Sequence, residues 1–416
     1  MSTSTEVMQS ANPVTVVTAC RACGTGLPSE TVFSLRDMPV VNFPKVAVAP
    51  QLVAPVELVK CPSCTLVQLR HTVDPDRMFR TYFYRSGISK TMREALADVA
   101  VAAQRMARIK PGEVVCDVGS NDGTLLSFYP TNLLRIGFEP SDAAKLGLIG
   151  KLGIVRDYFH RYQGAEGTFK VITACAMFYA VNDPGRFLED VKWSLAPGGL
   201  LIVQMNDLAS MLNGLAIDNI EHEHVAYYSA RAFCRLCEAH FMTVTDIEHN
   251  DVNGGSLRFY VRYGKNLKSK AFHAEENEAL SVTDLAWRNF TSELAKVRNT
   301  LRNCIIAAQG AGKQIGVCGA STRGLTLLHY LHLGGGTFCC AGDRDPAKVG
   351  RFYGATGIPI VDEEAMRMRA HTLLVAPYHF SKEIIQRERE FLERGGELII
   401  PLPKPKVITK EGERYL

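Results

Sequence analysis

Four cysteines near the start of the chain have the spacing of a metal site. They form two Cys-x-x-Cys pairs, Cys20 with Cys23 and Cys61 with Cys64. Thiolates from two such pairs can surround one Zn²⁺ ion tetrahedrally. Because four thiolates leave no open position, we expect a structural zinc site and not a catalytic one. The alternative is a set of redox-active or unrelated thiols among the twelve cysteines of the chain.

A second motif predicts a cofactor site. A run of β-type residues ends in Asp117-Val-Gly119-Ser-Asn-Asp122-Gly123, which fits a strand, a glycine-containing turn and a helix beginning near Thr124. The glycines let the backbone approach a ligand, and the helix offers its N-terminal amides. The spacing is not the G-x-G-x-x-G of a dinucleotide site. Two acids there suit the sulfonium and amino groups of S-adenosylmethionine (SAM), and the alternative is a similar crossover without a ligand.

Later turns of the same strand and helix pattern extend this predicted site. Glu139 follows the second strand and can accept hydrogen bonds from both ribose hydroxyls. The third turn can cover the adenine, and a further turn follows the fourth strand. The predicted cofactor-binding residues are Asp117, Gly119, Ser120, Asn121, Asp122, Gly123, Glu139, Pro140, Asp157, Tyr158, Phe159, Ala176 and Met177.

The densest cluster of titratable groups is Glu221-His222-Glu223-His224. Its histidines are two residues apart, and not four as in the His-Glu-x-x-His motif of zinc proteases. In an extended segment alternate residues project to one side, so we expect the histidines to face a site together and the glutamates to face away from it or orient the rings. A histidine beside a carboxylate is a natural general base near neutral pH. The alternative is a solvated charged loop.

The elements around these motifs predict an α/β protein. Residues 89–109 have helical periodicity, and a mostly helical stretch spans residues 273–310. The strand and helix patterns alternate, which indicates two Rossmann-like sheets. The β-type runs of these sheets are residues 114–118, 134–138, 171–174, 200–203, 315–318, 338–341, 373–376 and 398–400. We predict a zinc-binding module (1–75), a SAM-binding domain (76–265), and a helical linker with a C-terminal Rossmann-like domain (266–416).

Composition and charge exclude several classes of partner. The formal net charge is only +4 and is spread along the chain, whereas nucleic-acid binding needs clustered Lys and Arg. No apolar run is long enough to cross a bilayer, and the first residues lack the pattern of a signal peptide. We therefore expect a cytoplasmic monomer without nucleic-acid or membrane partners.

A loop in the C-terminal half predicts an anion site. Gly319-Ala-Ser-Thr-Arg323-Gly324 follows a strand and opens a helix, so its amides and Arg323 can hold a pyrophosphate. The alternative is an NAD site with Asp343 as the acid that binds ribose. His379 faces the interdomain cleft in one interpretation and is a packed side chain in the other.

The motifs occur together in an order that resembles a known family, the nucleotide-sugar C-methyltransferases, whose best-known members make branched sugars such as tetronitrose. The resemblance spans residues 20 to about 403. The motifs that carry it are the two cysteine pairs, Tyr82-Phe-Tyr84-Arg-Ser-Gly87, Asp117-Val-Gly-Ser-Asn-Asp-Gly123, His222-Glu-His224, Gly254-Gly-Ser-Leu-Arg258, Gly319-Ala-Ser-Thr-Arg-Gly324 and Pro377-Tyr-His-Phe380.

The resemblance implies a reaction and roles for these residues. The substrate would be a thymidine-diphosphate 4-keto-deoxyhexose, whose C3 hydrogen is acidic because it lies beside the C4 ketone. His224 would remove that hydrogen, Glu223 and His222 would support it, and Tyr84 would lie near the substrate. The new methyl group would come from SAM, and the C-terminal domain would help to grip the nucleotide sugar. The implied substrate-binding residues are Tyr82, Glu221, Tyr228, Gly319, Ser321, Thr322, Arg323 and His379.

The chain departs from the family pattern at two places. Glu221 stands where some members have a tyrosine, and residues 178–181 read Phe-Tyr-Ala-Val where some have a histidine. Both changes bear on the sugar and on the proton-transfer groups more than on the reaction class. Two other functions stay open at this point: an O- or N-methyltransferase, which would need no enolising base, and a non-catalytic zinc-dependent binding protein.

Overall fold

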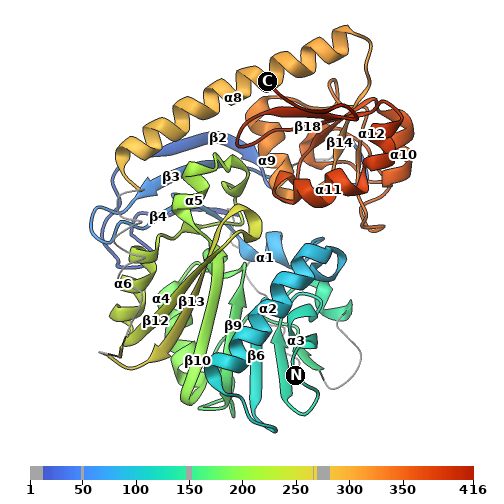
Figure 1. Cartoon of the computed structure of the whole chain (residues 1–416). Coiled ribbons are helices and arrows are strands. Elements are labelled where there is room, and N and C mark those ends of the chain that lie inside the picture. The colour runs from blue at the N-terminus through green and yellow to red at the C-terminus, as the bar shows by residue number, and fades with distance from the viewer. Residues whose placement is uncertain (1–12, 48–50, 147–151, 266, 269–281) are drawn as a thin grey trace, which may run out of the picture.

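A computed structural model of the chain describes residues 13–47, 51–146, 152–265, 267–268 and 282–416. Within these ranges the strands form four sheets, and Figure 1 shows three of them as the frames of an N-terminal, a central and a C-terminal part. The limits that we predicted for the three parts stay predictions. None of the helices in the described ranges is both long and apolar enough to cross a lipid bilayer.

The N-terminal part consists of short antiparallel strands. Its larger sheet has the order β11-β4-β3-β2, and β1 pairs with β5 beside it. Strand β11 (Ala226–Tyr227) comes from the central part of the sequence and pairs with β4, so the two parts share a sheet. The other elements are β1 (Val14–Val16), β2 (Phe33–Pro39), β3 (Val53–Lys60), β4 (Val67–Leu69), β5 (His71–Val73) and α1 (Pro75–Phe79).

The central part is a seven-stranded sheet in the order β12-β13-β10-β9-β6-β7-β8. Strands β10, β9, β6, β7 and β8 are parallel, whereas β13 and β12 run antiparallel at one edge. The predicted parallel sheet is confirmed. Its strands are β6 (Val114–Val118), β7 (Leu134–Phe138), β8 (Leu152–Val155), β9 (Phe169–Cys175), β10 (Leu195–Asn206), β12 (Met242–Asn250) and β13 (Ser256–Tyr263).

Helices cover both faces of this central sheet, because side chains that alternate along each strand are apolar on both faces. Val171 and Ile202 pack under α2 and α3, whereas Ile172 and Val203 pack under α4 and α6. Both α2 and the start of α3 at Thr124 were predicted correctly. The helices are η1 (Ser86–Ile88), α2 (Lys90–Ala107), α3 (Thr124–Ser127), η2 (Asp142–Leu146), η3 (Phe178–Ala180), α4 (Pro184–Ser194), α5 (Leu208–Asn213), η4 (Ile217–Asn219), α6 (Ala230–Ala239) and η5 (Val252–Gly254).

The C-terminal part is a second seven-stranded sheet, in the order β16-β15-β14-β17-β18-β19-β20. It is mixed, since β19 and β20 are antiparallel. Its strands are β14 (Ile315–Cys318), β15 (Cys340–Gly342), β16 (Ile360–Val361), β17 (Thr372–Val375), β18 (Glu397–Ile400), β19 (Lys406–Thr409) and β20 (Gly412–Tyr415). Its helices are α9 (Thr322–Leu331), η6 (Gly354–Thr356), α10 (Glu363–Arg369), η7 (Tyr378–Phe380), α11 (Ser381–Arg387) and α12 (Arg389–Glu393).

One long helix, α8 (Asp284–Gly310), ties the outer parts together. It runs along β2 and leads into the C-terminal sheet (Figure 1). Phe290 on α8 packs edge-on against Phe33 on β2, with ring centroids 5.4 Å apart. A continuous hydrophobic core extends from there through α5 and η4 to β14 and β17. The predicted helical stretch at 273–310 is confirmed over α8, while residues 273–281 lie outside the described residues.

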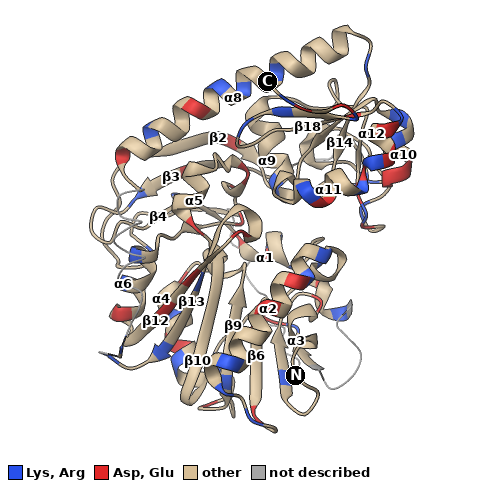
Figure 2. Ribbon diagram, in the orientation of Figure 1, with Lys and Arg blue, Asp and Glu red and all other residues tan. Residues whose placement is uncertain are grey.

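In the part of the chain that the structure describes, positively and negatively charged residues are interspersed. Figure 2 shows Lys and Arg interspersed with Asp and Glu along the ribbon, for example on α10 and α11. Many of them form opposite-charge pairs across short distances, such as Arg367 with Glu388 at 2.7 Å and Arg387 with Glu363 at 3.0 Å. This distribution agrees with the low net charge of the sequence.

Candidate functional site

The four cysteines of the two pairs converge in the N-terminal part. All four sulfur atoms lie within 4.8 Å of one another, and Cys20 Sγ is 3.5 Å from Cys64 Sγ. Three of the thiols are buried and Cys23 is exposed. Four thiolates at such separations fit the tetrahedral coordination that Zn²⁺ takes in closed structural sites. The predicted four-cysteine zinc site is confirmed.

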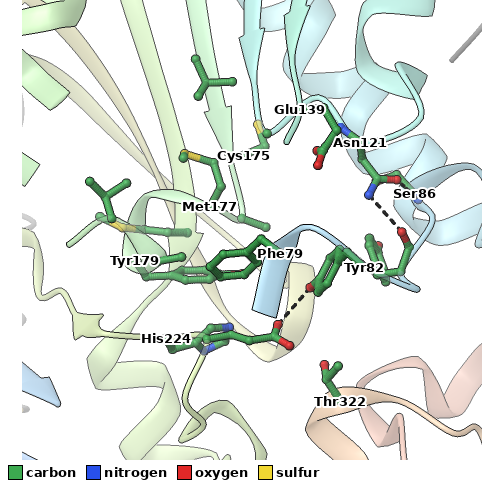
Figure 3. Close-up of a pocket in the computed structure, with 18 of the residues that line it drawn as sticks. Phe79, Tyr82, Ser86, Asn121, Glu139, Cys175, Met177, Tyr179, His224 and Thr322 are labelled. Atoms are coloured by element: carbon green, nitrogen blue, oxygen red, sulfur yellow. Dashed lines mark hydrogen bonds between the residues drawn. The ribbon is translucent and has the colours of Figure 1, made fainter. Parts of the chain in front are cut away.

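A cavity of about 620 Å³ opens at the carboxyl ends of β6, β7, β9 and β10, where open parallel sheets bind their ligands. All three parts of the chain line it. Figure 3 shows Glu139 and Asn121 together at one side of this cavity, Met177, Tyr179 and His224 at another, and Thr322 reaching it from the C-terminal part. Phe79 and Tyr82 of the N-terminal half also line it. A ligand here would contact three separate units of the fold.

The turn after β6 has a backbone that approaches the cavity closely. Gly119 has a φ of 69°, and a Cβ at this position would lie 3.1 Å from the side chain of Met177. Asn121 has a φ of 51°, a left-handed conformation that asparagine tolerates better than most residues. Its side chain accepts a hydrogen bond from Ser86 N and donates one to Tyr84 O, both at 3.0 Å (Figure 3). The turn therefore also positions the segment that carries Tyr84.

Glu139 presents a fixed carboxylate at the end of β7. Its Oε2 accepts a hydrogen bond from Asn121 N at 2.8 Å, and its Oε1 accepts one from Ser141 N at 2.9 Å. Each carboxylate oxygen has a second acceptor position. Glu139 lines the cavity, so both oxygens can accept hydrogen bonds from a pair of ribose hydroxyls. These residues fit the ribose of SAM.

Most of the predicted cofactor residues line the cavity. Those that do are Gly119, Asn121, Glu139, Pro140, Asp157, Tyr158, Phe159, Ala176 and Met177. Four lie behind this surface: Asp117, Ser120, Asp122 and Gly123. Asp117 Oδ1 accepts a hydrogen bond from Thr173 Oγ1 at 2.6 Å, and Asp122 accepts bonds from Gly87 N and Thr124 Oγ1. These two acids accept hydrogen bonds from backbone and hydroxyl groups of the protein. A direct contact of either acid with the cofactor stays a prediction.

Burial changes the charge of Asp117. Removal from water raises the pKa of this carboxyl to about 7, the nearby Glu139 adds to the rise, and the hydrogen bond from Thr173 opposes it. Near neutral pH Asp117 is therefore close to its midpoint of titration. It does not supply a full negative charge to the cofactor side of the cavity.

The segment 221–224 forms a buried turn, so the expected alternation of its side chains is wrong. His224 N donates a hydrogen bond to Glu221 O at 3.2 Å, which places Glu221, Glu223 and His224 all on the cavity. His222 points the other way, and its Nε2 lies 3.0 Å from Ala54 O on β3. The four side chains are at most 8% exposed, which excludes a solvated loop.

His224 is held as a neutral imidazole with one free nitrogen. Its Nδ1 lies 2.7 Å from Asn219 O, and because a carbonyl only accepts, Nδ1 carries the hydrogen. Nε2 then has a lone pair and lies 3.4 Å from Glu221 Oε1. Burial, followed by the charge of Arg323, lowers the pKa of His224 to about 3. The ring of Tyr179 covers the imidazole, with centroids 4.0 Å apart.

The two glutamates of the turn share a water-poor site. Tyr82 Oη donates a hydrogen bond to Glu223 Oε2 at 3.0 Å (Figure 3). Burial raises the pKa of Glu223 to about 7, while the bond from Tyr82 lowers it. Burial and the nearby Glu223 raise the pKa of Glu221 well above its ordinary value. Two carboxyls this close in a low dielectric cannot both ionise easily, so the pair retains a proton near neutral pH.

The C-terminal part contributes an ion pair at the cavity wall. Arg323 Nε donates to Asp218 Oδ2 at 2.9 Å, and His379 Nε2 lies 3.2 Å from the same oxygen. Tyr378 Oη donates to the other oxygen of Asp218. Burial alone would raise the pKa of Asp218, but Arg323 and His379 outweigh it and hold this pKa below its ordinary value. Sequence reasoning missed Asp218, because no motif marks it.

Some of the predicted substrate residues line the cavity, and others lie behind its surface. Tyr82, Glu221, Ser321, Thr322, Arg323 and His379 line the cavity, as does the predicted catalytic residue Tyr84. Tyr228 packs behind it against Phe178, and Gly319 is closed off by Pro377. Asp343 also lies outside the lining and accepts hydrogen bonds from Ala320 N and Lys348 Nζ. This position does not favour the alternative of an NAD site.

Three family models match the chain in succession. Residues 20–79 match a zinc binding domain, residues 86–244 a methyltransferase domain, and residues 251–403 the C-methyltransferase C-terminal domain. Together these matches cover the three parts of the fold in the order in which the structure has them.

Among characterised proteins, the chain is similar to the C-methyltransferase NovU of Streptomyces niveus. The two are 28% identical over 377 residues, which cover 86% of this chain and 88% of the relative. Solved structures overlap the chain only in part. The 1,6-didemethyltoxoflavin-N1-methyltransferase of Burkholderia thailandensis is 15% identical with a TM-score of 0.34 and covers 42% of this chain and 80% of that one. The plantazolicin methyltransferase BpumL is 14% identical, also with a TM-score of 0.34, and covers 41% and 83%.

Proposed function

Since the chain is a SAM-dependent C-methyltransferase with a four-cysteine zinc site, we propose that it methylates carbon 3 of a nucleotide-linked 4-keto-deoxysugar, in the synthesis of branched deoxysugars. The observation that carries this proposal is a neutral imidazole, His224, with a free Nε2 in a buried cavity. A C–H bond beside a ketone needs a base of this kind. A methyltransferase that acts on oxygen or nitrogen has no C–H bond to break and needs no enolising base.

The residues of the cavity divide the work of cofactor and substrate binding. Glu139 and Asn121 would hold SAM at the ends of β6 and β7, where a side chain in place of Gly119 would crowd Met177. Bound SAM supplies the methyl group that an electron-rich carbon accepts. Thr322 at the N-terminus of α9 faces the same cavity from the C-terminal part and is placed to contact the nucleotide sugar.

The proton transfer rests on the fixed tautomer of His224. The carbonyl of Asn219 holds the hydrogen on Nδ1, so Nε2 can take the C3 proton of the sugar. His224 and the two glutamates are buried, and the low dielectric around them strengthens their electrostatic contacts. Tyr82 and Glu223 form the adjoining wall and orient the sugar.

Arg323 has a smaller part in this proposal than the sequence suggested. Its guanidinium is already paired with Asp218, which leaves fewer donors for a pyrophosphate. We propose that it chiefly sets the position of the C-terminal part over the cavity, while the amides at the start of α9 face the phosphates.

Hydrogen exchange at carbon 3 tests the proposal. The purified protein is incubated in D₂O with SAM and a panel of nucleotide-linked 4-keto sugars, and mass spectrometry follows both deuterium uptake and methylation. We expect one class of 4-keto sugar to exchange its C3 hydrogen and to gain one methyl group. Failure of every 4-keto sugar to exchange would overturn the proposed substrate class.

The variant His224→Ala tests the base. We expect exchange and methylation to fall by about 10²–10⁴-fold, the usual range for removal of a general base. SAM affinity, measured by calorimetry, should stay within about threefold, because His224 lies away from Glu139 and Asn121 (Figure 3). If this variant keeps full activity, the assignment of His224 is wrong.

A further inference from the structure

Glu221 is a buried acid whose hydrogen bonding is incomplete. Its side chain is 1% exposed and lines the cavity. Within the described part of the chain, no group bonds to its Oε2. A buried polar atom without a partner costs roughly 1–3 kcal/mol. A substrate atom that completes this hydrogen bond would offset that cost, so the position of the atom at the cavity indicates contact with a ligand.

The place of Glu221 beside the base matters for enolisation. Its Oε1 lies 3.4 Å from Nε2 of His224. In a 4-keto sugar, the C3 hydrogen that leaves and the C4 oxygen that gains charge belong to neighbouring carbon atoms. A base for the first and a donor for the second must therefore lie within a few ångströms of each other. The carboxyl of Glu221 and Nε2 of His224 meet this requirement.

The surroundings of Glu221 favour the protonated form of its carboxyl group. Burial has the largest effect in raising the pKa of Glu221, and the negative charge of Glu223 has the second largest. The charge of Arg323 opposes this rise, whereas the charge of Asp218 adds to it. A protonated carboxyl donates a hydrogen bond, whereas a carboxylate can only accept. The titratable groups that face Glu221 are Glu223, His224, Asp218, Arg323, Tyr82, Tyr179, Tyr227 and Tyr353.

We propose that Glu221 is a catalytic acid that donates a hydrogen bond to the C4 oxygen of the substrate as the enolate forms. This inference rests on the proposed function and assigns a further residue to it. As His224 Nε2 takes the C3 proton, the electrons of the C–H bond form the C3–C4 double bond. The π electrons of the ketone move onto the C4 oxygen. The carboxyl of Glu221 stabilises the resulting negative charge by donating a hydrogen bond to that oxygen.

The same contact serves the second half of the reaction. When carbon 3 forms its bond to the methyl group, the electron pair of the broken methyl–sulfur bond stays on sulfur. The C4 ketone forms again and Glu221 keeps its proton. The proton on His224 then leaves to solvent, so the step balances without an oxidant or reductant.

Two variants of Glu221 test this role. Glu221→Met keeps the approximate volume and removes the donor, and Glu221→Gln keeps an N–H donor without the acid. We expect C3 exchange and methylation to fall by about 10²–10³-fold in the Met variant, the loss seen when one donor to a developing oxyanion is removed. The Gln variant should lose less. SAM affinity should not change in either.

Stability separates this role from a structural one. Removing a buried acid that lacks a partner should leave the melting temperature of Glu221→Met unchanged or higher, even though activity falls. If Glu221→Met does not fold, Glu221→Leu carries the test, because it also removes the donor. Exchange at the wild-type rate in a folded variant without the donor, such as Glu221→Met, would overturn the role of Glu221 while leaving the proposed function intact. Absence of exchange in the wild-type protein would instead overturn the proposed function.

Discussion

At Glu223 and His224, burial acts on two neighbouring groups in opposite directions. It lowers the pKa of the histidine to about 3 and raises the pKa of the glutamate to about 7, because each group loses the water that stabilises its charged form. The histidine is therefore neutral throughout the physiological range. The imidazole that we propose as the base is therefore unprotonated before a substrate binds.

Asp117 gives a pH-dependent prediction. Its pKa rises from 3.8 in the unfolded chain to about 7, so between these values the folded protein holds a proton that the unfolded chain has released. The stability of the wild-type protein therefore falls as pH rises from 4 to 7 through this group. We expect Asp117→Asn to be more stable than the wild type at pH 8, by about 4 kcal/mol at most, and the gain should shrink toward pH 4.

Denaturant unfolding at several pH values measures this difference. Asp251→Asn provides a control, because it makes the same substitution at an exposed position. A gain for Asp117→Asn that does not vary with pH would contradict the buried, protonated carboxyl.

Among the elements, β11 links the zinc module to the proton-transfer groups. This strand begins two residues after His224, and Ala226 and Tyr227 pair with Gln68 and Val67 on β4. His222 adds a second link through Ala54 on β3. A zinc ion bound to the four cysteines would hold the pair Cys61 and Cys64, which precedes β4. We therefore expect the metal to set the position of the catalytic turn without touching the substrate.

Removal of one zinc ligand tests this link. Cys61→Ser should reduce zinc from about one ion per chain, lower the melting temperature and reduce C3 exchange by at least about tenfold, because structural zinc binding contributes about 10 kcal/mol or more to folding. Cys304→Ser on α8 is a control outside the metal site. Metal analysis, calorimetry of SAM binding and the exchange assay give the three measurements. Full exchange activity in zinc-free Cys61→Ser would contradict a positioning role.

At the same scale, the sequence predicted some elements well and others not at all. The strands β6, β7, β9 and β10 were predictable, because each is a short apolar run buried on both faces. The conformation of 221–224 was not, since alternating residue types fit an extended strand equally well. His222 contacts Ala54, 168 residues away, and this contact holds its ring away from the cavity.

Over the whole molecule, contacts distant in sequence assemble the cavity. Asp218 meets Arg323 across 105 residues and His379 across 161, and each of these contacts joins the central part to the C-terminal part. No local pattern could reveal this network. The family models explain why the motifs were nevertheless informative, because each part of the chain carries its own recognisable segment.

The shared core extends this assembly beyond the cavity. Helix α8 packs on β2 and continues to the C-terminal sheet, so one hydrophobic cluster connects the outer parts. The cavity therefore lies among three parts that a common core holds together. This arrangement suits a substrate with two separate features, a sugar near His224 and a phosphate-bearing end near α9.

The position of the transferred methyl group tests the central claim most directly. The protein is supplied with SAM labelled with ¹³C in its methyl group and with the 4-keto sugar nucleotide that exchanges, and the product is examined by NMR. We predict that the labelled carbon is bonded to carbon 3, next to the C4 ketone. A label attached to oxygen or nitrogen would contradict the account.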